Sequence, residues 1–144
     1  MTTKNTYNTP IDLEKVTNIE HQSESHQGDL KYSIDYDAPE NTDIYAAADG
    51  IIIAVKDDSK IGGLDKKFEA DGNFIEILHD NNEVSEYEHI KFKSAKVKVG
   101  DKIKAGQKIA KVGNTGWSAC PHLHFMIYPK GKEYKTLKIK FIGK

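Results

Sequence analysis

The sequence predicts a mostly β protein, an antiparallel sandwich or barrel of short strands with little helix. Short stretches rich in Ile, Val, Tyr and Phe recur along the chain, separated by Gly, Pro, Asn and Asp. Such stretches at close spacing indicate strands joined by tight turns. We find no stretch with the apolar periodicity of an amphipathic helix of four turns. The 144 residues suffice for one domain with a single core.

Three strands are expected in the first half of the chain. Residues 32–37 alternate apolar and polar side chains, which is the pattern of a half-buried strand. Residues 44–48 and 51–55 form two further apolar stretches. The Asp49-Gly50 pair between them favours a tight hairpin.

The second half of the chain contains a clearer hairpin and several shorter strands. Residues 74–79 and 84–90 are apolar stretches joined by four turn-forming residues, so we expect them to pair. The other elements expected are short strand–turn units at residues 97–101 and 103–107, and strands at residues 108–112 and 135–142.

The first twenty residues show little apolar periodicity, so we expect an N-terminal arm at residues 1–20 and a domain at residues 21–144. The arm contains no apolar core of a signal peptide. No apolar run approaches the roughly 18 residues that a membrane-spanning helix needs. A leader removed from the chain, a phage origin and an intracellular role all stay open.

Charge and cysteine content exclude several classes of function. The net charge is −1, with acidic residues concentrated in the first half and lysines in the second. The chain has no arginine, so bidentate contacts with phosphate or guanine are unavailable, and we expect no nucleic-acid partner. The single cysteine, Cys120, excludes an internal disulfide framework and a zinc site of several cysteines.

The segment GNTGWSACPHLHFMIY, residues 113–128, holds the strongest candidate site. Two turn-rich elements precede an apolar strand that carries two histidines. Because successive side chains of a strand point to opposite faces, His122 and His124 share one face while Leu123 and Phe125 point into the core. A catalytic zinc ion takes three protein ligands, commonly His and Asp or Glu, and leaves one position for water. The pair can supply one or two of the three.

Several upstream residues could complete such a site. Asp35 and Asp37 lie on the polar face of the strand at residues 32–37, so both stay open as ligands. We expect Asp29 to cap a glycine turn, His21 to lie on the surface and His79 to be structural. The histidines upstream of the pair are His21, His26, His79 and His89.

Five fragments, in order, resemble the lysostaphin-type (LytM-like) zinc metallopeptidases that cleave peptide bonds in peptidoglycan. They are HQG, YSIDYDAPENTDIYAAADGIIIAV, the Tyr-x-His of YEHI, VKVGDKIKAGQKIAKVGNTG and PHLHF, and the resemblance extends from about His26 to Tyr128. The resemblance implies a β sandwich of the duplicated-hybrid-motif type, similar to a barrel-sandwich hybrid, with a metal in a groove on one sheet. It also implies hydrolysis of peptidoglycan cross-links or stem peptides.

Carried over by position, the resemblance implies that His26, Asp35 and His124 bind one zinc ion. It implies that His89 and His122 are unligated and face the reaction centre. Such an ion lowers the pKa of bound water from 15.7 towards about 7, and a residue that donates to the oxyanion contributes on the order of 10²–10³ in rate. Which of the two histidines acts as the base stays open.

Two departures from the family pattern are visible. Eight residues separate His26 from Asp35, where many members have three, and the longer spacing resembles a branch in which residues loop out before a Tyr-x-x-Asp strand. Met126 stands where an acidic residue often follows the histidine strand. We expect a monomer that acts on a peptidoglycan peptide, in the cell envelope or outside the cell, as the resemblance implies.

Other classes of function give weaker matches. Cys120 lies two residues before His122, but this spacing does not ensure the geometry of a Cys–His nucleophilic pair. The run at residues 97–113 resembles the turns of biotinyl and lipoyl carriers, yet no lysine lies in a carrier tripeptide. A phosphocarrier on the same fold would need no carboxylate such as Asp35. A binding module that has lost catalysis would not need to keep all five site residues.

Overall fold

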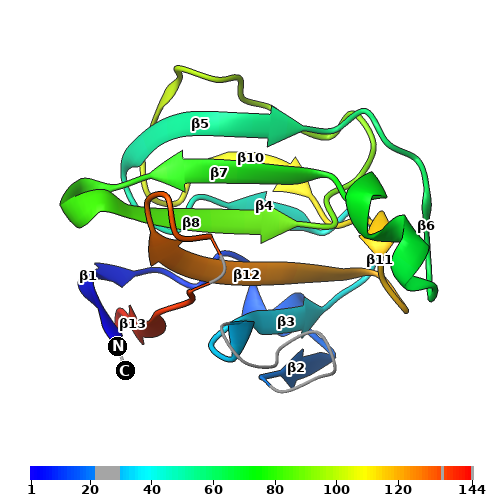
Figure 1. Ribbon diagram of the computed structural model, residues 1–144, viewed down its shortest axis with the longest axis horizontal. Helices are drawn as coiled ribbons and strands as arrows, with labels where there is room; N and C mark the ends of the chain where they lie inside the picture. Colours follow the sequence, from blue (N-terminus) through cyan, green and yellow to red (C-terminus); the bar gives the residue numbers. More distant parts are fainter. Residues whose placement is uncertain (22–29, 134, 144) are drawn as a thin grey trace.

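The computed structural model describes residues 1–21, 30–133 and 135–143, and its centre is a seven-stranded sheet (Figure 1). All neighbouring strands of this sheet run antiparallel. In spatial order the strands are β2 (Asn18–Glu20), β3 (Ile34–Asp37), β12 (His122–Pro129), β8 (Glu83–Glu88), β7 (Phe74–Leu78), β5 (Gly50–Lys56) and β9 (Lys102–Ile103).

A smaller layer packs on one face of this sheet. β4 (Asp43–Tyr45) and β10 (Lys108–Lys111) pair antiparallel, and Figure 1 shows them behind β7 and β8. Ile44 and Ile109 from this layer join Ile77 and Phe125 from the large sheet in one core, and all four are fully buried. Burying apolar side chains between two layers is the main favourable contribution to folding. The prediction of a mostly β, antiparallel sandwich is confirmed.

The N-terminal residues are part of the sheet structure, contrary to the irregular arm that we expected. β1 (Thr2–Tyr7) pairs in parallel with the last strand, β13 (Lys138–Phe141), and Figure 1 shows these two strands beside each other. β2 forms the edge of the large sheet beside β3. β1 was not predicted because few of its side chains are buried. Tyr7 is one of them, and a strand of this kind shows little apolar periodicity in its sequence. The division of the chain at residue 21 stays a prediction.

The hairpin expected at Asp49-Gly50 is wrong. β4 and β5 do not pair with each other; β4 pairs with β10, and β5 pairs with β7 and β9. The two strands therefore belong to different layers, and the Asp-Gly pair marks the crossing between them. A turn signal is local and does not determine which strands pair over a long distance.

The hairpin of β7 and β8 is confirmed, with five residue pairs in register. Its connection is a short 3-10 turn, η4 (Asp80–Asn82), in which Asn81 and Asn82 adopt positive φ angles that asparagine tolerates well. The strand–turn units expected at residues 97–107 reduce to β9. The other described elements are β6 (Gly62–Gly63), β11 (Gly116–Trp117), η1 (Leu13–Lys15) and η3 (Lys66–Asp71).

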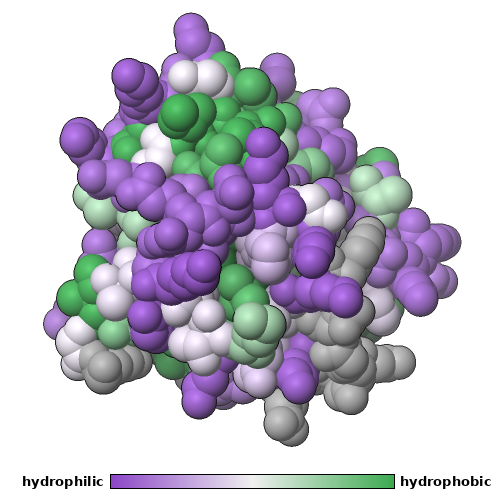
Figure 2. Space-filling view, turned by 60° about the vertical axis from the view of Figure 1, so that its left-hand side comes forward, coloured by the Kyte–Doolittle hydropathy of each residue, from purple (hydrophilic) through white to green (hydrophobic). Residues whose placement is uncertain are grey.

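Hydrophilic residues dominate the face seen in Figure 2, with one hydrophobic area near its top. This agrees with a chain in which 30% of the residues are charged. Within the described residues, no helix has the length and apolar character needed to cross a membrane.

The strand β12 alternates as predicted and so places the candidate site. Leu123 and Phe125 are fully buried in the core between the layers. His122 and His124 point to the other face of the large sheet, where β12 lies between β3 and β8. The site is therefore built on the first residues of β12 and on what its two neighbouring strands bring beside them.

Candidate metal centre

His124 lies at the centre of the candidate site. The strand register sets it directly opposite Asp35 of β3 on one side and Glu88 of β8 on the other. Its Nδ1 atom is 3.0 Å from Oδ1 of Asp35, and its Nε2 atom is 3.4 Å from Oε2 of Glu88. Burial alone would lower the pKa of His124, but the charges of Glu88 and Asp35 outweigh it and raise that pKa.

Asp35, and not Asp37, is the carboxylate that contacts His124. Asp35 is only 8% exposed, and the same Oδ1 atom that contacts His124 lies 3.7 Å from Nε2 of His122. Asp37 is one pair further along β3, opposite His122, and is partly exposed. Its carboxylate accepts a hydrogen bond of 3.4 Å from Asn18. The geometry thus distinguishes two carboxylates that the alternation pattern left equivalent.

The ring of His122 is oriented by the loop before β12. Its Nδ1 atom lies 2.8 Å from the carbonyl oxygen of Cys120 and 3.0 Å from the hydroxyl of Ser118. A carbonyl can only accept, so Nδ1 carries the hydrogen and Nε2 is the nitrogen left to accept a proton. His122 is buried, which fixes this orientation by packing as well.

His89 follows β8 and has an unusual backbone conformation. Its φ angle is +67°, in the left-handed region that non-glycine residues seldom adopt and that is enriched at functional sites. Its Nδ1 atom donates to the carbonyl oxygen of Thr115 at 2.5 Å. The ring centroid lies 4.4 Å from that of His122 and 6.0 Å from that of His124. Burial and the neighbouring His122 lower the pKa of His89 to about 4.

Gly116 allows the loop carrying Thr115 to approach His89. Its φ angle is +82°, and a Cβ atom at this position would lie 2.7 Å from Cα of Gly72 and 3.3 Å from Nδ1 of His89. Any side chain there would displace the backbone or the imidazole. Gly116, the second glycine of the Gly-Asn-Thr-Gly turn, is thus required because the backbone approaches Gly72 and His89 closely there.

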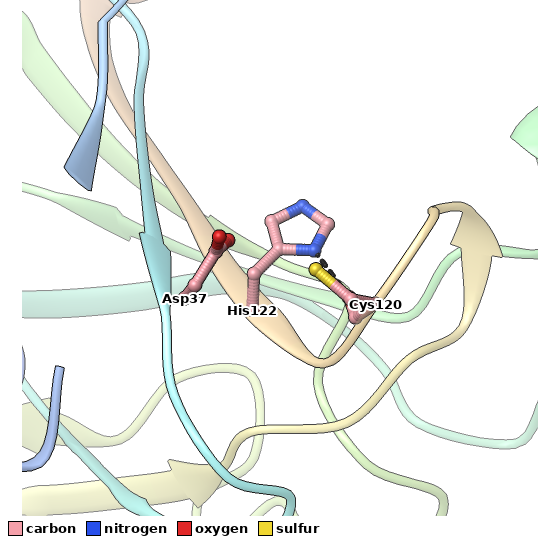
Figure 3. A group of neighbouring side chains, drawn as sticks. All are labelled: Asp37, Cys120 and His122. Carbon is pink, nitrogen blue, oxygen red and sulfur yellow. Dashed lines mark hydrogen bonds between the residues drawn. The ribbon is translucent and has the colours of Figure 1, made fainter. Parts of the chain in front are cut away.

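A second group of potential ligands overlaps the first. Side-chain donor atoms of Asp37, Cys120 and His122 lie within 4.8 Å of one another. Figure 3 shows Asp37 extending from β3 towards His122 on β12, with Cys120 beside the ring. Cys120 is exposed as a residue, but partial desolvation of its thiol and the nearby Asp37 raise the pKa of that thiol. The thiol is therefore protonated and weakly nucleophilic near neutral pH.

Of the remaining candidates, the structure describes His21 and His79. His26 and Asp29 lie outside the described residues. His21 is exposed, as expected. His79 is buried, with Nδ1 2.7 Å from the carbonyl oxygen of Asp49 and Nε2 2.8 Å from the hydroxyl of Ser85. Both of its ring nitrogens are used in internal contacts, which agrees with the structural role expected for it.

Sequence reasoning missed Glu88 and its neighbour Glu86. Both lie on the site face of β8, because Tyr87 between them is buried in the core. The alternation around Tyr87 was a usable signal for this face. It could not show that β8 pairs beside β12 in the register that sets Glu88 opposite His124.

The described residues fit a zinc ion. A carboxylate oxygen and an imidazole nitrogen face each other on rigid neighbouring strands, and both side chains are buried. Oxygen and imidazole nitrogen donors are the ligands of catalytic zinc sites. Without a cation beside it, such a buried carboxylate would carry a large desolvation cost.

Comparison with known proteins agrees with a metal centre in this fold. The chain matches Peptidase family M23 over residues 29–136. It is 30% identical over 141 residues to the peptidoglycan DD-endopeptidase ShyC of Vibrio cholerae, covering 90% of this chain and 29% of that protein. A zinc-containing peptidase of Vibrio cholerae superposes with a TM-score of 0.65 at 25% identity, covering 92% of this chain and 39% of that one.

A second solved structure aligns with this chain over nearly the full length of each. The catalytic domain of the prophage-encoded M23 protein EnpA from Enterococcus faecalis, solved as a mutant, superposes with a TM-score of 0.64 at 29% identity, covering 90% of this chain and 91% of that one. The fold, the carboxylate–histidine centre and these similarities together are those of the zinc metallopeptidases. The chain belongs to peptidase family M23, which confirms the resemblance seen in the sequence. It spans less than a third of the length of the curated relatives that it matches.

Proposed function

We propose that this chain is the catalytic domain of a zinc-dependent endopeptidase that hydrolyses peptide bonds in cross-links or stem peptides of bacterial peptidoglycan. The observation that carries the proposal is the convergence of Asp35, His124, His122 and His89 on one face of the sheet. The name of the Vibrio cholerae relative, a peptidoglycan DD-endopeptidase, supports the substrate class.

The ligand set that we propose is His26, Asp35 and His124, for one zinc ion per chain. Asp35 and His124 are supported by their contact of 3.0 Å and by their burial. The assignment of His26 rests on the resemblance alone. When bound, zinc supplies a Lewis acid that activates water and polarises the peptide carbonyl.

His89 and His122 move protons and stabilise charge in this proposal. Each ring has its Nδ1 atom on a backbone carbonyl, so each has Nε2 available to accept a proton. Because the pKa of His89 is lowered to about 4, its ring is neutral at pH 7 and its Nε2 atom is unprotonated there, as a proton acceptor requires. Once protonated, either imidazole can donate to the developing oxyanion or to the leaving amine.

The same proposal covers partners and place of action. The partner is a peptidoglycan peptide, and the place is the cell envelope or the cell exterior, where such substrates occur. We further propose that the domain acts as a monomer.

The proposal is tested by digesting purified sacculi with the zinc-loaded chain and identifying the released fragments by mass spectrometry. We expect peptide fragments with a new amine and a new carboxylate at one bond. Chelation should abolish the release, and added zinc should restore it. Release of sugar-only products, or equal release by the chelated chain, would contradict a zinc peptidase.

A further inference from the structure

His124 is flanked by carboxylates on both neighbouring strands. Asp35 faces its Nδ1 atom at 3.0 Å, and Glu88 faces its Nε2 atom at 3.4 Å. Both neighbours are set by strand register, because each is directly opposite His124 in the sheet. The ring is therefore held between two acceptors by three adjacent strands, and each acceptor addresses a different nitrogen.

A histidine that binds a metal through one ring nitrogen commonly donates the hydrogen of the other to a carboxylate or carbonyl. Nδ1 of His124 faces Asp35, the other proposed ligand, so it is the nitrogen on the metal side. We propose that Glu88 is a positioning residue that accepts the Nε2 hydrogen of His124, fixes its tautomer and ring orientation, and so strengthens zinc binding. This inference rests on the proposed function, since it takes His124 as a metal ligand.

A row of polar side chains holds Glu88 in place. Glu86 lies two residues earlier on the same face of β8, and its carboxyl group interacts with those of Glu88 and Glu76. Tyr128 donates to Glu76 at 2.6 Å and lies 3.4 Å from Glu86. Burial and the two adjacent carboxylates raise the pKa of Glu86, so it is neutral and can donate to Glu88.

Position and chemistry both assign the accepting role to Glu88. Its carboxylate is 29% exposed and lies between β12 and β7, opposite His124 and Phe74. A carboxylate on this partly buried surface would be costly without a cationic or donating partner. The distance of 3.4 Å to Nε2 becomes a hydrogen bond after a sub-ångström movement of a side chain with three rotatable bonds.

Zinc affinity of the purified, intact chain, measured by competition with a chelator, tests this inference. We expect Glu88→Gln and Glu88→Ala to bind zinc about 10–100-fold more weakly, the usual cost of losing such a partner. Glu86→Gln keeps a donor towards Glu88 and should stay within about threefold of the wild type, whereas Glu86→Leu should weaken binding. Glu14→Gln, an exposed change on η1, is the control.

Thermal unfolding of the metal-free variants separates positioning from a structural role. We expect Glu88→Gln to unfold near the wild-type temperature without metal and to gain less stability from added zinc. Wild-type zinc affinity in both Glu88 variants would overturn the inference, whatever their stability. A wild-type chain that binds zinc but releases nothing from sacculi would refute the proposed function and leave this inference standing. A wild-type chain that binds no zinc would overturn both.

Discussion

The large sheet contains two histidine centres whose ring nitrogens are used in different ways. At one centre, His79 has a carbonyl on one nitrogen and a hydroxyl on the other, and its ring packs edge-on against Tyr7 at 5.2 Å. At the other, His124 lies between two carboxylates. Both hydrogen-bond partners of the first ring are neutral groups, so the ring needs no cation. The second gathers negative charge around an imidazole, and a metal ion would compensate that charge.

This difference separates structural from chemical histidines better than burial does. His79, His122 and His124 are all buried to a similar extent. The pKa values of two of them move in opposite directions: burial lowers that of His79, while Glu88 and Asp35 raise that of His124. Carboxylates in direct contact with the ring nitrogens, and not the depth of the side chain, indicate which ring is prepared for a cation.

The largest expected effect distinguishes the two carboxylates of β3. Asp35→Asn should lose bound zinc and peptidoglycan cleavage together, because it removes the charged donor that contacts His124. Asp37→Asn, two residues away on the same strand, should keep its zinc and is the matched control. Metal content by elemental analysis and release from sacculi are the measurements. The reverse pattern would make Asp37 the ligand.

A smaller effect is expected at His89. His89→Ala should keep zinc and lose cleavage by on the order of 10²-fold, as expected when a proton-transferring group is removed. His79→Ala is the matched control, since it truncates a buried histidine outside the site. Turnover normalised to the folded, zinc-loaded fraction makes the comparison fair. If His89→Ala lost its zinc, the residue would belong among the ligands.

The smallest effect concerns stability at the structural centre. His79→Leu should destabilise the metal-free chain by about 1–3 kcal/mol, because it removes the buried hydrogen bonds of the ring to the carbonyl of Asp49 and the hydroxyl of Ser85. The folded-state pKa of His79 lies below its unfolded value of about 6.5. The unfolded chain therefore binds more protons, and this contribution to stability is present above pH 6.5 and is lost as the pH falls through the lowered pKa.

Denaturant unfolding at several pH values checks this last prediction. The loss of stability between neutral and acidic pH should be smaller in His79→Leu than in the wild type. Equal pH dependence in the two chains would show that folding does not lower the pKa of His79. It would also remove the contrast between the two histidine centres.

The sequence predicted those parts of the site that depend on local periodicity. Alternation along the histidine strand correctly put His122 and His124 on one face and Phe125 in the core. Alternation also put Asp35 on the polar face of β3. It could not separate Asp35 from Asp37, because that choice depends on the register between β3 and β12.

Long-range pairing set the limits of prediction elsewhere too. The Asp49-Gly50 signal was read as a hairpin, but packing of β4 on β10 and of β5 on β7 decides the pairing there. The pairing of β1 with β13 joins the two terminal strands, so no local pattern could predict it. Glu88 was missed for the same kind of reason, since its importance arises from a neighbour on a strand much later in the sequence. Local patterns predict faces, whereas register determines partners.

The central claim is that two histidines, two residues apart on one strand, have different tasks. Zinc content and turnover of His122→Ala and His124→Ala, measured side by side, test it most directly. We expect His124→Ala to lose both, and His122→Ala to keep most of its zinc while its turnover falls by on the order of 10²-fold or more. A metal-free His122→Ala together with a zinc-loaded His124→Ala would contradict the account.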